Sequence, residues 1–205
     1  MLFRSLFNAS TPLTLAETAS IFGETVTFGR MLSEEQDPRA RLALLGGRIE
    51  DICASVFRQI AMNRFEDAAH NARRDDGELS ADRLADEWMR TQRDMFGDSL
   101  TITDGYRSWW SYIPHFIHTP GYVYAYAFGN LLALAVYARY EREGAGFVPN
   151  YLQLLAAGGS DTPDELGRMV GVDLADPGFW NAGLDVVDEL VTEAEKLAAS
   201  QPSSS

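Results

Sequence analysis

Two of the three histidines and four of the eight tyrosines lie together in residues 113–137, a stretch that is otherwise largely apolar. His118 comes directly before Thr119-Pro120, a pair typical of a helix N-cap followed by proline in the first turn. A helix that begins there would carry Tyr122 and Tyr126 on successive turns of one face. Imidazole and phenol groups beside the positive end of a helix could donate hydrogen bonds to a carboxylate or a developing oxyanion. Alternatively, the tyrosines pack with their hydroxyl groups at the rim, and the spacing alone favours neither interpretation.

A carboxylate near the N-terminus is the second candidate for chemistry. Glu17 lies in TPLTLAETAS, within a predicted helix whose other faces are small or apolar, so we expect it to be buried. Thr14-x-x-Glu17 matches a capping box, in which the glutamate reaches back to the backbone N–H of the N-cap residue. Glu24 follows two turns along the same face, and with Ser20 nearby the pattern predicts either a polar site or a solvated stripe. On the residues alone the capping box is favoured, because isolated glutamate ligands of metals are rare.

No complete catalytic motif is present in the sequence. There is no HExxH, the helical pair of histidines that holds zinc with a glutamate base between them. The GxSxG, P-loop and dinucleotide-binding patterns are also absent. His70, in EDAAHNARR, is expected on a solvated helix face. The single cysteine, Cys53, is expected to fill space in the core and not to act as a nucleophile.

Composition predicts a soluble protein of one domain. The 205 residues are 46% hydrophobic and 11% aromatic, which is enough to build a core. A formal net charge of -13 argues against nucleic acid or an anionic membrane surface as a partner. Residues 121–138 carry no charge and reach the lower limit of membrane-spanning length, but their tyrosines, glycines and Asn130 argue against such a span. A single cysteine and the lack of a secretory signal pattern predict a cytoplasmic protein.

Thr-Pro and Asp-Pro pairs recur along the chain, and each predicts the start of a helix. With the spacing of the apolar residues, they predict a mainly α fold. The predicted long helices cover residues 12–32, 38–72, 120–143 and 177–199, and shorter ones cover 80–97, 146–157 and 163–170. Residues 1–199 are expected to form one helical domain, and the Ser-rich residues 200–205 a disordered tail.

Segments that together cover nearly the whole chain carry a family resemblance. In order, they are PLTLAETASIFGE, SVFRQIAMNRFED, WWSYIPHFIHTPGYVYAYAFG, FVPNYLQLLAAGGS and DPGFWNAGLDVVDELV. Together they resemble the C-terminal third of oligoendopeptidase F, a branch of the thimet-oligopeptidase-like zinc metallopeptidases. The resemblance implies that the helices form the C-terminal part of a zincin-like, thimet-oligopeptidase-type catalytic domain.

The resemblance also implies roles for the candidate residues. In that family the HExxH helix supplies two histidine ligands and the general base, and a glutamate on the next helix is the third zinc ligand. The glutamate in LAETAS, Glu17, matches that ligand. A histidine and tyrosine segment of the family donates hydrogen bonds to the substrate carbonyl as it becomes tetrahedral. The matching residues here are His115, His118, Tyr122 and Tyr126. Within this segment Tyr122 is the expected principal donor, because it would stand in the first turn of the predicted helix. Tyr124, about 200° further around that helix at ~100° per residue, is expected to face packing instead.

The activity that the resemblance implies is zinc-dependent hydrolysis of short peptides, in which metal-activated water attacks the scissile carbonyl. The HExxH helix and the N-terminal lobe of the family have no counterpart in this sequence. The chain alone is therefore expected to be an inactive fragment, whose partner is the missing N-terminal part of the same enzyme. Met1 could be a misassigned start, the start of a truncated gene or that of a real secondary product. The alternative is a free-standing, non-catalytic helical module that keeps a peptide-binding groove.

Overall fold

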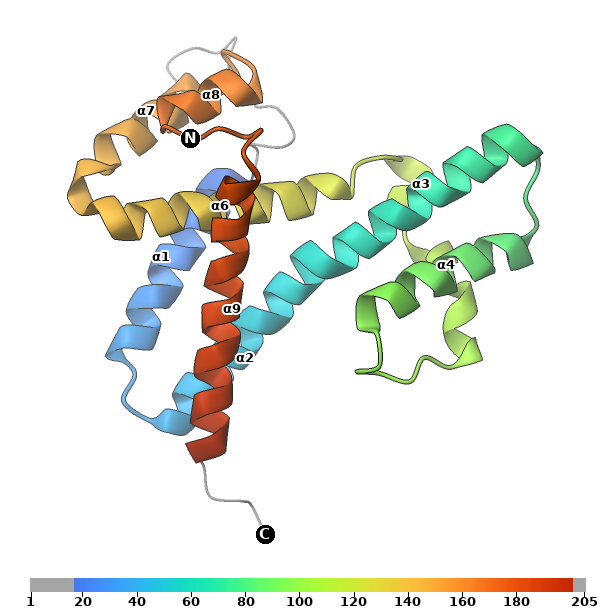
Figure 1. The fold of residues 1–205 in the computed structure, drawn as a ribbon, viewed down its shortest axis with the longest axis horizontal. Coiled ribbons are helices and arrows are strands. Elements are labelled where there is room, and N and C mark those ends of the chain that lie inside the picture. The colour runs from blue at the N-terminus through green and yellow to red at the C-terminus, as the bar shows by residue number, and fades with distance from the viewer. Residues whose placement is uncertain (1–16, 201–205) are drawn as a thin grey trace. The chain divides into compact units, whose positions relative to one another are not determined.

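The computed structural model describes residues 17–200, and these residues form helices joined by short loops (Figure 1). The α-helices are α1 Thr18–Glu34, α2 Pro38–Ile52, α3 Arg58–Asp76, α4 Ala81–Phe96, α5 His115–His118, α6 Tyr124–Glu143, α7 Val148–Ala157, α8 Pro163–Met169 and α9 Pro177–Ser200. Cys53–Phe57 forms a π-helical turn, and Asp104–Tyr112 and Gly144–Gly146 form 3₁₀ turns. No strand occurs among residues 17–200, and the predicted mainly α fold class is confirmed.

Three of the proline pairs begin helices because a short polar side chain caps each of them. The Asp37 and Asp176 carboxylates accept backbone N–H groups of the first turns of α2 and α9, at 3.0 and 2.8 Å. The Thr162 hydroxyl caps α8 by accepting the N–H of Glu165 at 3.3 Å. This is the chemistry that the pattern predicts, since both partners lie within one turn of each other. The helix start predicted at residue 12, Thr14 and the tail residues 201–205 lie outside the described residues.

The predicted helix over residues 120–143 begins later, at Tyr124. Thr119 ends α5 as its C-cap, with φ -144°, and Gly121 has φ +74°. A right-handed helix cannot continue through a positive φ, so residues 119–123, here called the site turn, separate α5 from α6. The prediction that Thr119-Pro120 caps a helix is therefore wrong.

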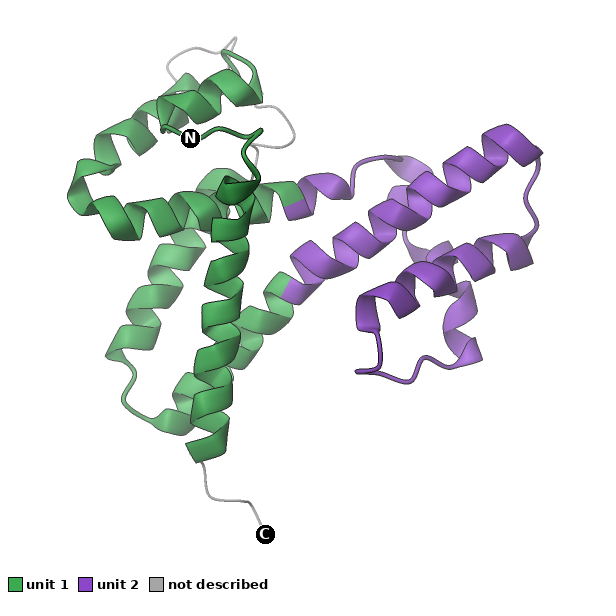
Figure 2. Ribbon diagram, in the orientation of Figure 1, with its two compact units in different colours: residues 1–52, 128–205 green, residues 53–127 purple. Residues whose placement is uncertain are grey.

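Contacts divide the chain into two compact units, one of residues 1–52 with 128–205 and one of residues 53–127 (Figure 2). The core of the first unit combines side chains from α1, α6 and α7 with the segment after α8. Its buried members are Phe22, Leu132, Val136, Phe147, Tyr151, Val170 and Val172. In the same unit, α9 comes so close to α6 that a Cβ on Gly183 would lie 2.8 Å from the carbonyl oxygen of Leu131. Only glycine permits this approach of two helix backbones.

The second unit contains α3, α4, α5 and the first residues of α6, and its core combines aromatic with aliphatic and methionine side chains. Its buried members are Met62, Phe65, Ala69, Trp88, Met89, Ile113 and Val123. Trp88 packs edge-to-face on Phe65, with ring centroids 5.5 Å apart, and its indole N–H donates to the carbonyl of Tyr106 at 3.1 Å. Val123, the last residue of the site turn, is completely buried, so this core holds one end of the turn.

The predicted helix over residues 38–72 is interrupted at Cys53. The π-helical turn Cys53–Phe57 lies between α2 and α3, and α3 continues to Asp76. A π turn adds a residue to the helical period and rotates the faces that follow it. Cys53, the first residue of this turn, is exposed, and its predicted burial is wrong. His70 is exposed on α3, as predicted. None of the helices in the described part of the chain is long and apolar enough to span a membrane.

Candidate active site

The backbone between α5 and α6 brings together side chains that do not lie on one helix. The N–H of Tyr122 donates to the carbonyl of Thr119 at 3.2 Å, which closes the site turn. The carbonyl of Tyr122 then accepts the N–H of Ala125 at 3.0 Å, in the first turn of α6. Tyr122 therefore stands just before α6 and not inside it, while Tyr126 lies on its first turn.

His115, Tyr122 and Tyr126 form one group of rings, here called the His–Tyr cluster, and all three side chains are half-buried. The Nε2 atom of His115 lies 3.1 Å from the Tyr126 hydroxyl oxygen, within hydrogen-bonding distance. The ring of Tyr122 stacks beside His115 with centroids 6.0 Å apart, and it meets Tyr126 edge-to-face at 5.2 Å. The cluster thus presents an imidazole and two phenols on one short segment.

Hydrogen bonding within the cluster restricts how its rings can turn. Which partner donates in the His115–Tyr126 hydrogen bond depends on the imidazole tautomer. In either case the bond holds the imidazole ring nearly perpendicular to Tyr126, at 88°. Tyr122 packs against both of these rings. A phenol held by two neighbouring rings is a preorganised group, which is what hydrogen bonding to a developing charge requires.

The remaining residues of this segment do not join the cluster. His118 ends α5 with an exposed side chain, and no hydrogen bond or ring contact connects it to the cluster within the described part of the chain. Tyr124 is 42% exposed, so the expectation that it faces packing is wrong. That expectation placed Tyr122 and Tyr124 on one helix, whereas the helix begins only at Tyr124.

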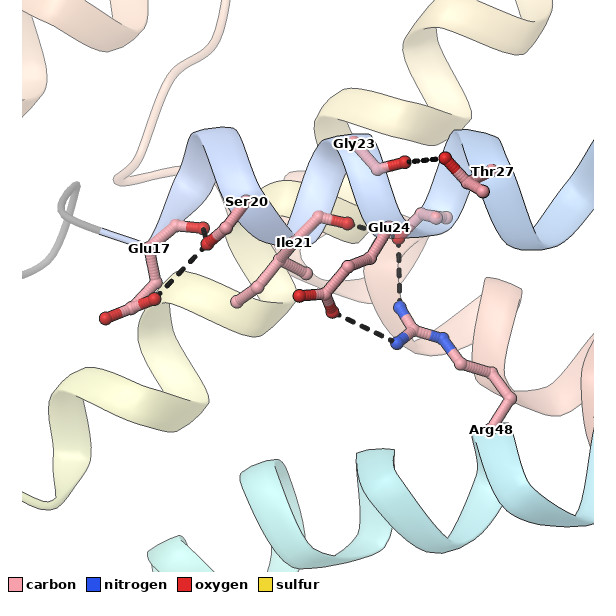
Figure 3. Close-up of polar contacts among 8 residues, drawn as sticks. Glu17, Ser20, Ile21, Gly23, Glu24, Thr27 and Arg48 are labelled. Atoms are coloured by element: carbon pink, nitrogen blue, oxygen red, sulfur yellow. Dashed lines mark hydrogen bonds and ion pairs between the residues drawn. The ribbon is translucent and has the colours of Figure 1, made fainter. Parts of the chain in front are cut away.

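Glu17 lies at the N-cap position of α1, in the other compact unit, and its side chain is exposed and not buried as expected (Figure 3). The Ser20 hydroxyl lies 3.0 Å from the backbone carbonyl oxygen of Glu17 and 3.3 Å from its carboxylate. Glu24 has a different environment, since its carboxylate lies 3.8 Å from the guanidinium of Arg48 (Figure 3). Thr14, the partner that a capping box would need, lies outside the described residues.

Glu17 could serve as one ligand of a metal ion. Its carboxylate is exposed and accepts a hydrogen bond from the Ser20 hydroxyl, and a carboxylate oxygen is one of the ligands that zinc accepts in proteins. A protein zinc site needs about three such ligands. Within residues 17–200, however, no group of three or more His, Cys, Asp or Glu side chains is placed to hold a metal ion. Glu17 can therefore serve only together with ligands from elsewhere.

One residue that sequence reasoning missed touches the site turn directly. Glu66, on α3, is 4% exposed, and its Oε1 atom accepts the backbone N–H of Gly121 at 2.8 Å. The available signal was a carboxylate at a core position beside Phe65, in RFEDAAH. Its partner lies 55 positions away, so the sequence pattern alone does not connect the two.

Residues 2–186 match peptidase family M3, and the chain belongs to this family of metallopeptidases. The predicted resemblance to oligoendopeptidase F is confirmed by its relatives. Oligopeptidase PepF of Bacillus subtilis (strain 168) is 31% identical over 183 residues, which cover 89% of this chain and 27% of that protein. Group B oligopeptidase PepB of Streptococcus agalactiae is 30% identical, over 90% of this chain and 31% of that protein.

A solved structure agrees with these sequence relatives. The crystal structure of oligoendopeptidase-F from Enterococcus faecium superposes with a TM-score of 0.84 at 28% sequence identity. The match covers 92% of this chain and 36% of that one. The chain thus spans less than a third of the length of the two curated relatives named above. Its helices correspond to a helical part of a family M3 peptidase.

Proposed function

We propose that this chain provides the transition-state-stabilising wall, and one metal ligand, of a zinc-dependent endopeptidase that acts on short peptides. The observation that carries the proposal is the His–Tyr cluster, in which a hydrogen-bonded His115–Tyr126 pair supports the ring of Tyr122. The names of the relatives, oligopeptidase and oligoendopeptidase, support short peptides as the substrate class.

In this proposal Tyr122 donates its hydroxyl hydrogen to the scissile carbonyl oxygen as that oxygen gains negative charge. A neutral phenol suits this role because it forms a stronger hydrogen bond to the charged oxyanion than to the carbonyl of the bound substrate. His115 and Tyr126 hold the Tyr122 ring in place and contribute further donors to the same region. His118, at the exposed end of α5, is left to contact the peptide beside the scissile bond.

Glu17 would be the metal ligand that this chain contributes, because its carboxylate is exposed and a carboxylate is a common zinc ligand. When bound, the divalent metal of such a peptidase polarises the scissile carbonyl and activates water. The other ligands and the general base would come from an HExxH helix in the N-terminal part of the same enzyme, which is the proposed partner. We place this enzyme in the cytoplasm, and neither nucleic acid nor a membrane has a role in the proposal.

Reading the coding DNA upstream of the Met1 codon is the first test. An in-frame HExxH there supports the proposed partner. Its absence, with stable expression of the chain from Met1, favours the non-catalytic peptide-binding module instead.

Kinetics of paired tyrosine variants test the chemistry. The chain is joined to its upstream part or, where none is encoded, exchanged for the matching segment of Bacillus subtilis PepF, and cleavage of a quenched short peptide is measured. Tyr122→Phe should lower kcat by about 100- to 1000-fold, the usual loss for one oxyanion donor, with KM and metal content little changed. Tyr124→Phe is the matched control, because Tyr124 is exposed and outside the cluster. Equal effects of the two substitutions would refute the proposed role of Tyr122.

A further inference from the structure

Glu66 carries a carboxyl group at a buried position beside the hydrophobic core of the second unit, and the reaction as described does not use it. It is 4% exposed and lies on α3 between Phe65 and Ala69, both members of the core of the second unit. Its Oε2 atom is buried without a hydrogen-bond partner among the described residues. Burial of a carboxyl group is unfavourable unless hydrogen bonds compensate it. The hydrogen bond that Glu66 accepts through Oε1 therefore offsets part of the free-energy cost of burying it.

That contact goes to the residue directly before Tyr122. The N–H of Gly121 donates to Oε1 of Glu66 at 2.8 Å. Gly121 has φ +74°, a conformation that glycine adopts easily and other residues rarely do. A glycine in a turn is flexible in the absence of tertiary contacts, so an acceptor fixed on α3 selects one of its conformations.

We propose that Glu66 is a positioning residue for the candidate active site and holds the site turn in place through its hydrogen bond with Gly121. The anchor acts at Gly121 and the buried Val123 holds the other side, so Tyr122 is fixed between two points of attachment. Its ring is thereby kept against His115 and Tyr126. All of these residues belong to the unit of residues 53–127. The positioning is a property of that unit, while its effect on turnover rests on the proposed function.

The hydrogen bond itself can be observed in the unaltered chain. A long-range HNCO experiment should show a through-hydrogen-bond coupling between the amide nitrogen of Gly121 and the carboxyl carbon of Glu66. If this coupling is absent while couplings across other well-ordered hydrogen bonds are detected, the proposal is overturned without any mutation.

Two substitutions then separate the acceptor from the shape of the side chain. Glu66→Met keeps an unbranched chain of similar length but has no oxygen, whereas Glu66→Gln keeps an acceptor for the Gly121 N–H. In Glu66→Met, amide exchange at Gly121 should become about 10-fold faster, the factor expected for loss of one buried hydrogen bond. The nuclear Overhauser contacts of Tyr122 with His115 and Tyr126 should also weaken. In Glu66→Gln both measurements should stay close to the unaltered chain.

Asp67→Asn is the matched control, since it removes an exposed carboxylate from the next position of α3 and should leave Gly121 unchanged. A Glu66→Met chain that keeps both the Gly121 protection and the ring contacts would refute the positioning role.

Turnover in the joined enzyme distinguishes this failure from that of the proposed function. If Glu66→Met loosens the turn but Tyr122→Phe leaves kcat unchanged, the proposed function fails and the positioning role stands. If Tyr122→Phe is impaired but Glu66→Met leaves the turn and kcat intact, the positioning role alone fails.

Discussion

The close approach of α9 to α6 at Gly183 makes a quantitative prediction about stability. In Gly183→Ala the new Cβ would lie 2.8 Å from the carbonyl oxygen of Leu131 and 3.5 Å from the amide nitrogen of Ala135. Both atoms belong to the backbone of α6, so no side chain can rotate away, and α9 must shift by a few tenths of an ångström. Overpacking of this kind costs about 1–3 kcal/mol, which opposes the gain of about 1 kcal/mol from replacing a helical glycine by alanine. We expect a net loss of up to about 2 kcal/mol.

Gly47→Ala is the control, because Gly47 lies inside α2 and a Cβ there would meet nothing within 4 Å. The same substitution should then give only the helix-propensity gain, up to about 1 kcal/mol. The two variants should therefore differ by about 1–3 kcal/mol, or by roughly 0.5–1.5 M in urea midpoint for a slope near 2 kcal/mol/M. Urea unfolding followed by circular dichroism measures this difference. Equal stabilisation by the two substitutions would show that α9 does not approach α6 as described.

Three further outcomes follow, two from the metal ligand and one from the buried phenol of Tyr151. The chain on its own, after dialysis, should contain almost no zinc by elemental analysis, because one carboxylate cannot hold the ion against water, and stoichiometric zinc would contradict this ligand count. In the joined enzyme, Glu17→Gln should reduce bound zinc and peptide cleavage together, and retention of both would restore the capping-box interpretation. Burial raises the pKa of Tyr151 to about 12, so the folded state keeps the proton that the unfolded chain loses near pH 10. Stability should therefore hold below about pH 10 and fall between about pH 10 and 12, and urea midpoints at pH 9 and 11 should show a smaller fall in Tyr151→Phe.

Features of the fold that depend on neighbouring residues were predictable, and features that depend on distant contacts were not. The starts of α2, α8 and α9 follow from a polar side chain and a proline within one turn. The same pattern failed at Thr119-Pro120, where the chain turns at Gly121 and a carboxyl group from 55 positions away accepts its N–H.

The candidate site shows the same division. The sequence placed the histidines and tyrosines in one segment, and the structure adds which of them meet: His115 with Tyr122 and Tyr126, but not His118. The exposure of Glu17 could not be inferred from its apolar neighbours, because it depends on what packs against α1. Its role as a ligand came from family resemblance and not from spacing.

The exposed Cys53 has a practical consequence for experiments on this protein. It is the single cysteine of the chain and stands in the π-helical turn where the residues of one compact unit give way to those of the other. A maleimide dye or a nitroxide spin label would therefore attach at one defined place without any mutation. One additional cysteine on an exposed face of either unit would complete a donor–acceptor pair for distance measurements in solution. Without a reducing agent, the same thiol would link two chains covalently, so purification requires one.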